Sequence, residues 1–373
     1  MAPAIPMHGR MIHDRDGRTN FQSYSARGDR AINSISRADL NATLLDAAAA
    51  TRGVTLHFDQ PLVDVNVDTA ELNFGDGREP VHADVIIGAD GAGSIVRGSL
   101  VDAGRISVDI EESGFDYKEL TMPAVDGDFA MDPDALHIWP RGANMMIALP
   151  NPDHTFTCTL FWPKDANPSF ESLSSEADIL GHFAIEYADS MPLIPDLVDD
   201  FMHNPVGRLA TVHSDPWQVD GRIALIGDAA HGILPFFGQG ANCGFEDVVE
   251  LDRCLDETDD DWSLALPIYQ QRRRENAEAI AWLAKENFVE MRDKVNSPIF
   301  KLSQHAEHML ERVIPGYLSR YEMVSFSTVP YAEVITKSKA QHRAFALAGV
   351  GVAGAVAATT AALAYLGFRR SNA

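Results

Sequence analysis

Arg222–Asp247 has the sequence RIALIGDAAHGILPFFGQGANCGFED, whose order of strand, turn and helix is the most informative in the chain. The apolar run Ile223–Ile226 is typical of a short buried strand. Asp228 follows at the carboxyl end of that strand, where a carboxylate accepts hydrogen bonds from ribose or ribityl hydroxyls. Gly238 and Gly240 allow the backbone to lie flat against a planar ring. The stretch therefore predicts a nucleotide-type cofactor site at a sheet edge.

A helix is predicted to begin near Ala241, directly after the two glycines. The N-terminal end of a helix is positive, so it favours negative charge on whatever lies beside it. This arrangement suits the N1–C2=O edge of a reduced flavin, with Ala241 and Asn242 beside the isoalloxazine ring.

A second strand–turn unit lies earlier, at Asp84–Arg97, with the sequence DVIIGADGAGSIVR. A buried strand enters a Gly-rich turn at Asp90 and Gly91, and a helix is predicted to follow. Such a turn lets backbone N–H groups approach a phosphate. Taken alone, it is equally compatible with a tight strand-to-helix connection that binds nothing.

Composition narrows the classes of partner. Thirty Lys and Arg residues against 54 Asp and Glu residues give a formal net charge of −24, which argues against nucleic acid. The three cysteines, Cys158, Cys243 and Cys254, have no close C-x-x-C spacing, so no metal site is predicted and buried free thiols are expected.

The segment 344–368, AFALAGVGVAGAVAATTAALAYLGF, has no charge and is flanked by basic residues. About 20 apolar residues span a bilayer, so this segment is predicted to be a membrane anchor. Gly349, Gly351 and Gly354 form G-x-G-x-x-G, but no strand precedes them and the chain ends too soon after them for a dinucleotide site. A buried core helix is the alternative.

The coarse pattern divides the chain into five parts. Ser36–Ala50 is predicted to be a helix capped by Ser36, and strands are predicted at Val54–Phe58 and Leu62–Val67. Short β-like runs separated by Pro and Gly predict an antiparallel sheet inserted in the middle, and a helical pattern follows Pro267. The predicted parts are an α/β domain (1–100), an inserted β-sheet domain (101–215), a segment in which the α/β domain resumes (216–260), a C-terminal helical region (261–343) and a transmembrane anchor (344–368).

The D-G turn, the later G-D-A-x-H segment and the intervening β domain together resemble the class A flavoprotein aromatic hydroxylases. Further segments resemble the kynurenine 3-monooxygenase family within that class, and the resemblance covers essentially the whole chain. These segments are Ile5–His13, Ser34–Asn41, Leu136–Asn151, Phe156–Pro163, Gly227–Asp247, Asn287–Ser297 and Tyr321–Ser327. The implied fold is an N-terminally truncated α/β FAD-binding fold with an inserted antiparallel β-sheet domain, C-terminal helices and a C-terminal membrane helix.

The resemblance implies an enzyme of tryptophan catabolism and NAD biosynthesis. Such enzymes bind FAD, reduce it with NADPH, and use O₂ to form a flavin C4a-hydroperoxide that hydroxylates L-kynurenine to 3-hydroxykynurenine. The anchor would place a eukaryotic protein at the mitochondrial outer membrane, and a bacterial one at the inner membrane or in the cytoplasm.

The resemblance also implies roles for single residues. The implied substrate-binding residues are Arg10 for the carboxylate, its hydroxyl partner Tyr24, and Asn287, Glu290, Tyr321, Phe236 and Phe237. The implied cofactor-binding residues are Arg37, Leu62, Asp90, Gly91, Asp228, Pro235, Gly238, Gly240, Ala241 and Asn242. No side chain is assigned as a catalytic acid or base, and His231 is expected to be structural.

One departure from the family concerns the start of the chain. The family opens with a βαβ unit that carries G-x-G-x-x-G and an acidic ribose ligand, and this sequence has neither at its start. We therefore expect an absent ADP-binding half, either because the sequence is a fragment or has a misplaced start, or because the protein is a genuine truncated form. In the second case FAD affinity should be weakened, and the exposed edges of the remaining sheet would favour aggregation. Two alternatives remain: a related flavin hydroxylase of another aromatic acid, and an inactive, membrane-tethered truncated form.

Overall fold

The computed structural model describes residues 4–290 except 26 and 76, together with residues 309, 311, 313–314, 316–341 and 343. The chain divides into two units, Met1–Tyr317 and Leu318–Ala373. The second unit contains α9 (Arg320–Phe326), capped by Ser319, whose hydroxyl accepts a hydrogen bond from the N–H of Glu322. All other elements discussed below belong to the first unit.

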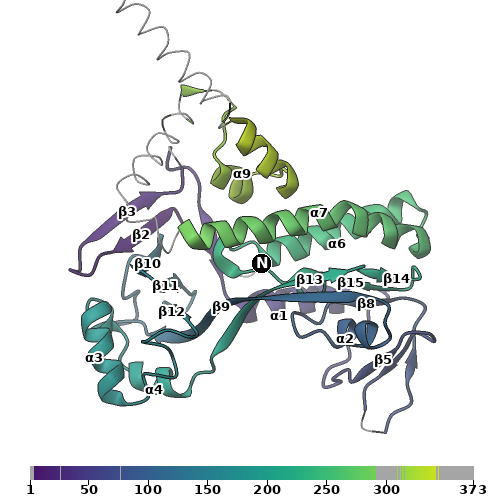
Figure 1. The fold of residues 1–373 in the computed structure, drawn as a ribbon, viewed down its shortest axis with the longest axis horizontal. Helices are drawn as coiled ribbons and strands as arrows, with labels where there is room; N and C mark the ends of the chain where they lie inside the picture. Colours follow the sequence, from purple (N-terminus) through teal and green to yellow (C-terminus); the bar gives the residue numbers. More distant parts are fainter. Residues whose placement is uncertain are drawn as a thin grey trace, which may run out of the picture. The chain divides into compact units, whose positions relative to one another are not determined.

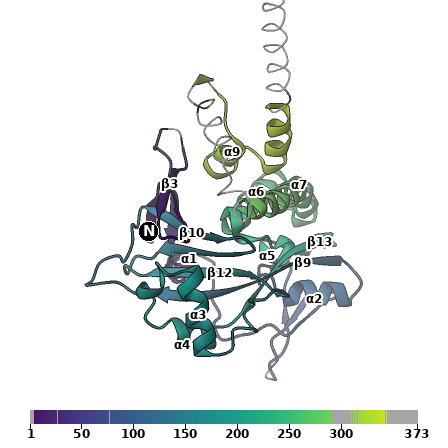
Figure 2. The ribbon, with the colours of Figure 1, turned by 60° about the vertical axis from the view of Figure 1, so that its left-hand side comes forward.

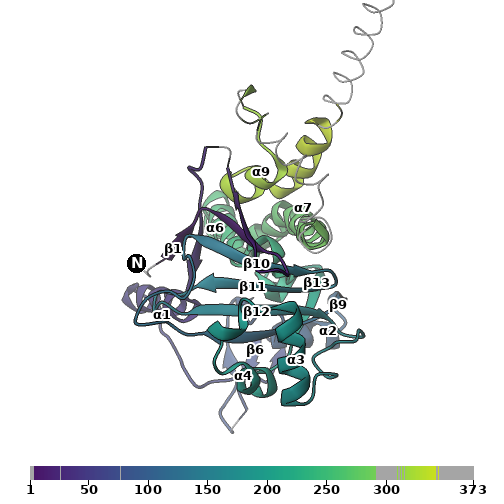
Figure 3. The same ribbon diagram turned by 90° about the vertical axis from the view of Figure 1, so that its left-hand side faces the viewer.

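The larger sheet of the first unit has seven strands (Figure 3). Its strands, in spatial order, are β13 (Gly207–Asp215), β9 (Ser107–Met122), β12 (Phe156–Pro163), β11 (Asn144–Pro150), β10 (Ala135–Arg141), β2 (Gly9–His13) and β3 (Thr19–Ser23). Neighbours are antiparallel except β10 and β2, which are parallel, with Leu136 opposite Arg10. The sheet thus combines strands from the middle of the chain with a hairpin near its start.

The two faces of this sheet bury different clusters, because successive side chains of a strand point to opposite faces. Trp139 packs with α3 (Glu176–Glu186), η1 (Met191–Leu193) and α4 (Leu197–His203). Its neighbour Ile138 packs with the other cluster, which includes residues of η2 and α7. Figure 1 shows α3 and α4 on one side of the sheet and α7 on the other.

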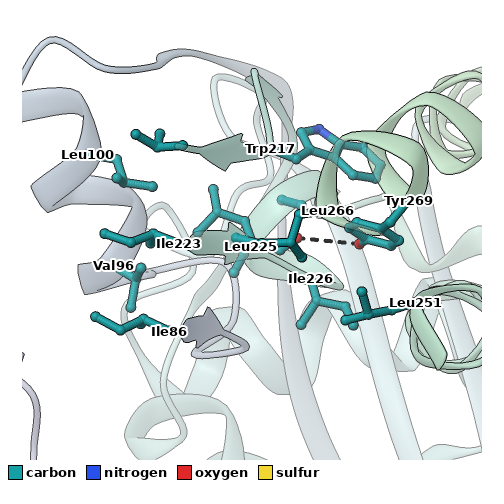
Figure 4. Packing of buried hydrophobic residues seen from close by; sticks show 14 of the residues in the cluster. Ile86, Val96, Leu100, Trp217, Ile223, Leu225, Ile226, Leu251, Leu266 and Tyr269 are labelled. Carbon is teal, nitrogen blue, oxygen red and sulfur yellow. Dashed lines mark hydrogen bonds between the residues drawn. The ribbon is translucent and has the colours of Figure 1, made fainter. Parts of the chain in front are cut away.

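A smaller sheet positions the predicted cofactor residues. It consists of β14 (Gln218–Val219), β15 (Ile223–Leu225) and β8 (Ile86–Gly88), with β15 and β8 parallel. Its core is covered by α2 (Ile95–Asp102) on one side and by α6 (Gly240–Glu257) and α7 (Trp262–Val289) on the other (Figure 4). The strand predicted within Asp84–Arg97 is confirmed as β8, and the strand predicted at Ile223–Ile226 is confirmed to within one residue.

Helices α6 and α7 lie side by side in Figures 1 and 2. The Tyr269 hydroxyl of α7 donates a hydrogen bond to the carbonyl of Leu225 at 3.3 Å, which ties the helix pair to β15 (Figure 4). Asp261 caps α7, so this helix starts before Pro267, which lies inside it.

The remaining elements are short. β1 (Ala4–Met7) pairs with β4 (Ile32–Ile35), and β5 (Asp64–Asn66), β6 (Glu71–Asn73) and β7 (Val81–His82) form a three-stranded sheet. The predicted helix is confirmed as α1 (Arg37–Ala50), with the Ser36 hydroxyl as its cap. The strand predicted at Val54–Phe58 is wrong: these residues form no strand, and no neighbouring strand pairs with them.

The predicted fold class needs one correction, because the structure does not support its C-terminal membrane helix. Among the residues that the structure describes, no helix has the length and apolar character needed to cross a bilayer. Residues 344–368, which the sequence assigned to the anchor, lie outside the described residues. The described residues form sheets that are covered by helices. The three cysteines are free and buried, as expected, and burial raises the pKa of Cys158 to about 12.

Candidate functional site

The turn after β15 places Asp228 at the carboxyl edge of the smaller sheet. The N–H of Ile226 donates to the carbonyl of Gly88 at 3.0 Å, so the ends of β15 and β8 lie together. Gly227 has φ 58° and ψ −141°, a conformation that favours glycine, and α5 (Asp228–His231) follows. The Asp228 side chain is exposed, and none of the described residues donates a hydrogen bond to its carboxylate. That carboxylate is available to a ligand.

The start of α6 forms the second half of the site. The 3₁₀ turn η2 (Pro235–Phe237) ends at Gly238, which has a left-handed φ of 66°. The side chain of Gln239, the residue before α6, makes no capping hydrogen bond to the helix. Its Oε1 instead accepts from Nδ2 of Asn242 at 3.0 Å. The positive end of an 18-residue helix therefore lies beside the exposed residues Ala241 and Asn242.

The D-G turn contributes backbone more than side chain. The Asp90 carboxylate accepts hydrogen bonds from the Ser94 hydroxyl at 2.5 Å and from the N–H groups of Ile95 at 2.7 Å and Val96 at 3.2 Å. It therefore caps α2, which is the structural alternative that the sequence left open. Gly91 has φ 80° and nothing within 4 Å of the position that a Cβ would take.

These features fit a flavin nucleotide. A Cβ placed on Gly91 or Gly238 would enter open space, so both turns expose bare backbone. An exposed carboxylate for hydroxyl groups and a helix N-terminus for negative charge lie at the same sheet edge. Asp228, Gly238, Gly240, Ala241 and Asn242 could therefore hold the ribityl chain and ring of FAD.

A buried polar cluster lies behind this edge. Asp247 Oδ2 is 2.5 Å from His231 Nε2 and accepts from the Gly227 N–H at 3.0 Å, while Oδ1 accepts from Arg273 Nε at 2.7 Å. Burial disfavours the charged form of Asp247, but the hydrogen bonds from His231 and Arg273 keep its pKa below the ordinary value. Burial also raises the pKa of Cys243 to about 12.

The donor atoms of this cluster are close enough together for a metal site, but the positive charge of Arg273 already lies among them. Donor atoms of His231, Cys243 and Asp247 lie within 4.8 Å of one another. The Arg273 guanidinium already contacts Asp247 and lies 3.4 Å from Cys243 Sγ. A metal cation would meet a fixed positive charge there, so the geometry favours an ion pair.

The substrate residues predicted near the start of the chain lie together. Arg10 lies on β2, is only 9% exposed, and places its guanidinium carbon 5.7 Å from the centre of the Tyr24 ring. Strand alternation puts Arg10 on the same face of the large sheet as Ile12, opposite Leu136 of β10. Ile12 and Leu136 belong to the cluster that contains Phe236.

Phe236 lies at the centre of an aromatic group on this face. Its ring stacks on Phe288 with centroids 4.0 Å apart and meets Phe161 edge-on at 5.0 Å. The Asn287 side-chain amide donates to the Phe236 carbonyl at 2.6 Å. The predicted substrate residues Asn287 and Phe236 are therefore in direct contact, and α7 is fastened to η2.

The other predicted residues are more dispersed. Glu290 ends α7, and its N–H donates to the carbonyls of Glu286 and Asn287. Pro235 and Phe237 flank Phe236 in η2. Tyr321 lies on α9 in the second unit, with its ring 6.1 Å from that of Phe326. Arg37 is exposed at the start of α1, and Leu62 packs partly against the core of the smaller sheet.

Known proteins with similar sequences assign the family. A family model described as an FAD binding domain matches residues 11–283. A kynurenine 3-monooxygenase from Stenotrophomonas maltophilia is 43% identical over 357 residues, which cover 94% of this chain and 78% of that protein. One from Dictyostelium discoideum is 42% identical over 343 residues, 88% of this chain and 75% of that protein. The chain belongs to the kynurenine 3-monooxygenase family.

Solved structures agree with the fold of this family member. The 2-methyl-3-hydroxypyridine-5-carboxylic acid oxygenase MHPCO aligns with a TM-score of 0.62 and 22% identity, covering 79% of this chain and 77% of that one. Klebsiella pneumoniae HpxO, solved with FAD and uric acid, aligns with a TM-score of 0.61 and 20% identity, covering 83% and 77%. At such identities the likeness shows the fold alone.

Sequence reasoning missed three buried charged residues of this family member. Arg97 donates to the carbonyl of Ala229 at 2.9 Å and to that of Ala92, which joins the D-G turn to α5. Asp247 and Arg273 form the buried pair described above. Arg97 and Asp247 are the last residues of the two motifs quoted in the sequence analysis, and this position was the signal that could have identified them. Arg273 stands in the run Arg272–Arg274, where nothing in the sequence separates it from its exposed neighbours.

Proposed function

We propose that this chain binds FAD between the Gly227–Asp228 turn and the start of α6, and hydroxylates kynurenine with NADPH as the electron donor. The observation that carries the proposal is the free Asp228 carboxylate beside a helix N-terminus with no side-chain cap, at the carboxyl edge of two parallel strands. Relatives named kynurenine 3-monooxygenase support FAD-dependent hydroxylation of kynurenine over another aromatic acid.

On the cofactor side, the proposed role of the chain is to bind FAD and to stabilise negative charge on its flavin ring. Bound FAD supplies the electrons and the activated oxygen that ring hydroxylation needs. Asp228 accepts hydrogen bonds from the ribityl hydroxyls, and the N–H groups at the start of α6 stabilise negative charge on the flavin ring. The backbone around Gly91 admits a phosphate, and Arg37 and Leu62 hold the more distant part of FAD.

On the substrate side, the chain orients the amino-acid head and excludes water. Arg10 pairs with the kynurenine carboxylate, and its burial strengthens that pairing because the local dielectric is low. Tyr24 lies within reach of the same group. The Phe236 and Phe288 rings provide an apolar surface for the aromatic ring, and the Asn287 bond keeps Phe236 in place. Phe237 and Glu290 complete the proposed substrate residues of the first unit, and the role of Tyr321 stays a prediction from the resemblance.

The first test is an FAD titration of the 373-residue chain, followed by flavin absorbance and fluorescence. We expect saturable binding of one FAD per chain, and hydroxylated kynurenine when NADPH, O₂ and kynurenine are added. A chain that circular dichroism shows to be folded, and that binds no FAD, would overturn the proposal.

The second test is Arg10→Ala, with Arg18→Ala as its control. Arg18 precedes β3, and its side chain is 79% exposed, so the same substitution there removes only a surface charge. We expect Arg10→Ala to raise KM for kynurenine at least tenfold, since a buried charge-assisted hydrogen bond contributes about 1.5–3 kcal/mol. An unchanged KM in Arg10→Ala would remove Arg10 from the substrate site.

A further inference from the structure

Asp247 connects three elements that the cofactor proposal leaves separate. It lies on α6 and has 0% exposure. One of its oxygens contacts both the Gly227 N–H, at the entrance of α5, and His231 Nε2, at the end of α5. The other accepts from Arg273 Nε on α7. A single carboxylate thus holds α5 at both ends.

Arg273 extends the connection to the first turn of α6. Its NH1 donates to Glu246 at 2.8 Å, and its NH2 donates to the carbonyl of Cys243 at 3.2 Å. Cys243 in turn donates its N–H to the carbonyl of Gln239, the residue that precedes α6. The chain of contacts therefore runs from the start of α6 through Arg273 and Asp247 to the turn that carries Asp228.

Backbone packing shows that the turn before α5 and the helix α6 lie close together. A Cβ on Gly227 would lie 3.8 Å from the Cα of Gly244, and a Cβ on Gly244 would lie 3.7 Å from the Cα of Gly227. The turn and α6 are thus in contact through two glycines, with the Asp247 hydrogen bonds beside them. A shift of either element would break a bond or open a gap.

The chemistry of the cluster requires a carboxylate and a guanidinium. Asp247 accepts from the Gly227 N–H and from Arg273 Nε, while a neutral amide would direct an NH₂ group at one of these donors. Lysine in place of Arg273 keeps the charge but has one nitrogen, whereas three guanidinium nitrogens bond Asp247, Glu246 and the Cys243 carbonyl.

We propose that Asp247 and Arg273 are positioning residues that set the spacing between Asp228 and the start of α6, and with it the affinity and environment of the flavin ring. The inference rests on the proposed FAD site. Neither residue faces open space, so each acts through the segments that it holds.

The test compares Arg273→Lys with Arg272→Lys. Arg272 is the adjacent residue of α7 and forms exposed ion pairs with Glu250 and Glu257, so it receives the same substitution without touching the buried cluster. We expect Arg273→Lys to weaken FAD binding at least tenfold and to change the visible circular dichroism of the bound flavin. Arg272→Lys should match the wild type in both. Both readouts are taken where far-ultraviolet circular dichroism shows each variant to be folded.

A purely structural role for Arg273 predicts a different result. Arg273→Lys would then lower the melting temperature of the FAD-free chain while leaving FAD affinity and the flavin spectrum unchanged, and that outcome overturns the inference. A wild-type chain that is folded but binds no FAD overturns the proposed function itself. Wild-type binding with an unaffected Arg273→Lys overturns only the inference.

A milder pair of variants covers the case in which Arg273→Lys does not fold. His231→Leu removes one donor to Asp247 and leaves the Arg273 bond in place, while His231→Gln supplies a replacement N–H donor. We expect His231→Leu to shift the flavin circular dichroism and weaken FAD binding several-fold, and His231→Gln to restore both toward wild type. Equal flavin spectra and affinities in both variants and the wild type would overturn the inference.

Discussion

The buried pair His13 and His137 allows a quantitative prediction of acid sensitivity. His137 Nε2 lies 2.8 Å from the Asp132 carbonyl, which only accepts, so Nε2 carries a proton. His137 Nδ1 then accepts from His13 Nε2 at 2.8 Å. His13 Nδ1 lies 2.6 Å from the Asp189 carboxylate, and His137 is the neutral ring in this network.

The magnitude follows from the pKa of His137. Burial, together with the adjacent His13 charge, lowers this pKa from 6.5 to about 4 in the folded chain. The unfolded chain therefore binds a proton at a pH at which the folded chain does not. The free energy of unfolding falls as the pH drops from about 6.5 to about 4, by about 3 kcal/mol in total. Above pH 7.5 this group contributes no pH dependence.

His137→Gln isolates that effect, because glutamine can keep one acceptor and one donor but does not titrate. His203→Gln is the matched control, since His203 is exposed on α4. Urea unfolding from pH 7 to pH 4 should show the wild-type advantage over His137→Gln shrinking by about 3 kcal/mol. The difference between wild type and His203→Gln should stay level. Parallel pH curves for wild type and His137→Gln would refute the assignment of a neutral, buried His137.

Three further predictions concern other parts of the first unit. Gly88→Ala should destabilise the chain by about 1–3 kcal/mol in urea unfolding, because the new Cβ would lie 2.8 Å from the Cβ of Val96. As the control, Gly98→Ala in the open part of α2 should be neutral or stabilising. Arg97→Lys should lower stability by about 1–3 kcal/mol, since it leaves a buried carbonyl without a donor; an unchanged urea midpoint would contradict this. Cys158, with a pKa near 12, should resist iodoacetamide at pH 8 until urea is added, and rapid native labelling would count against its burial.

Local signals in the sequence predicted the local parts of the site. The strand, glycine turn and helix start at Ile223–Asn242 follow from neighbouring residues, and the structure shows them at the expected places. The same holds for α1, whose Ser36 cap is readable from the sequence. The D-G turn was ambiguous because an Asp before a helix serves a ligand or a cap; the contacts of Asp90 show the cap, and its role toward the cofactor stays a prediction.

Long-range pairings were beyond the sequence. β2 lies parallel to β10, although more than a hundred residues separate them, and nothing local in Gly9–His13 specifies that partner. Val54–Phe58 has strand-like composition but no neighbour to pair with, and strand formation depends on such a neighbour. Arg273 differs from Arg272 only in the side of α7 on which it lies, which becomes meaningful once α6 packs there.

The short helix α5 explains why buried charge surrounds the proposed flavin site. A helix of four residues is not stable by its own hydrogen bonds, so its position must come from tertiary contacts. Arg97 holds it from the D-G turn through the Ala229 carbonyl, and Asp247 holds it from α6 through Gly227 and His231. Burying these charges is unfavourable unless each is fully hydrogen-bonded, a condition that permits little movement of α5. Asp228 is thereby presented at a defined place while its own carboxylate stays free for a ligand.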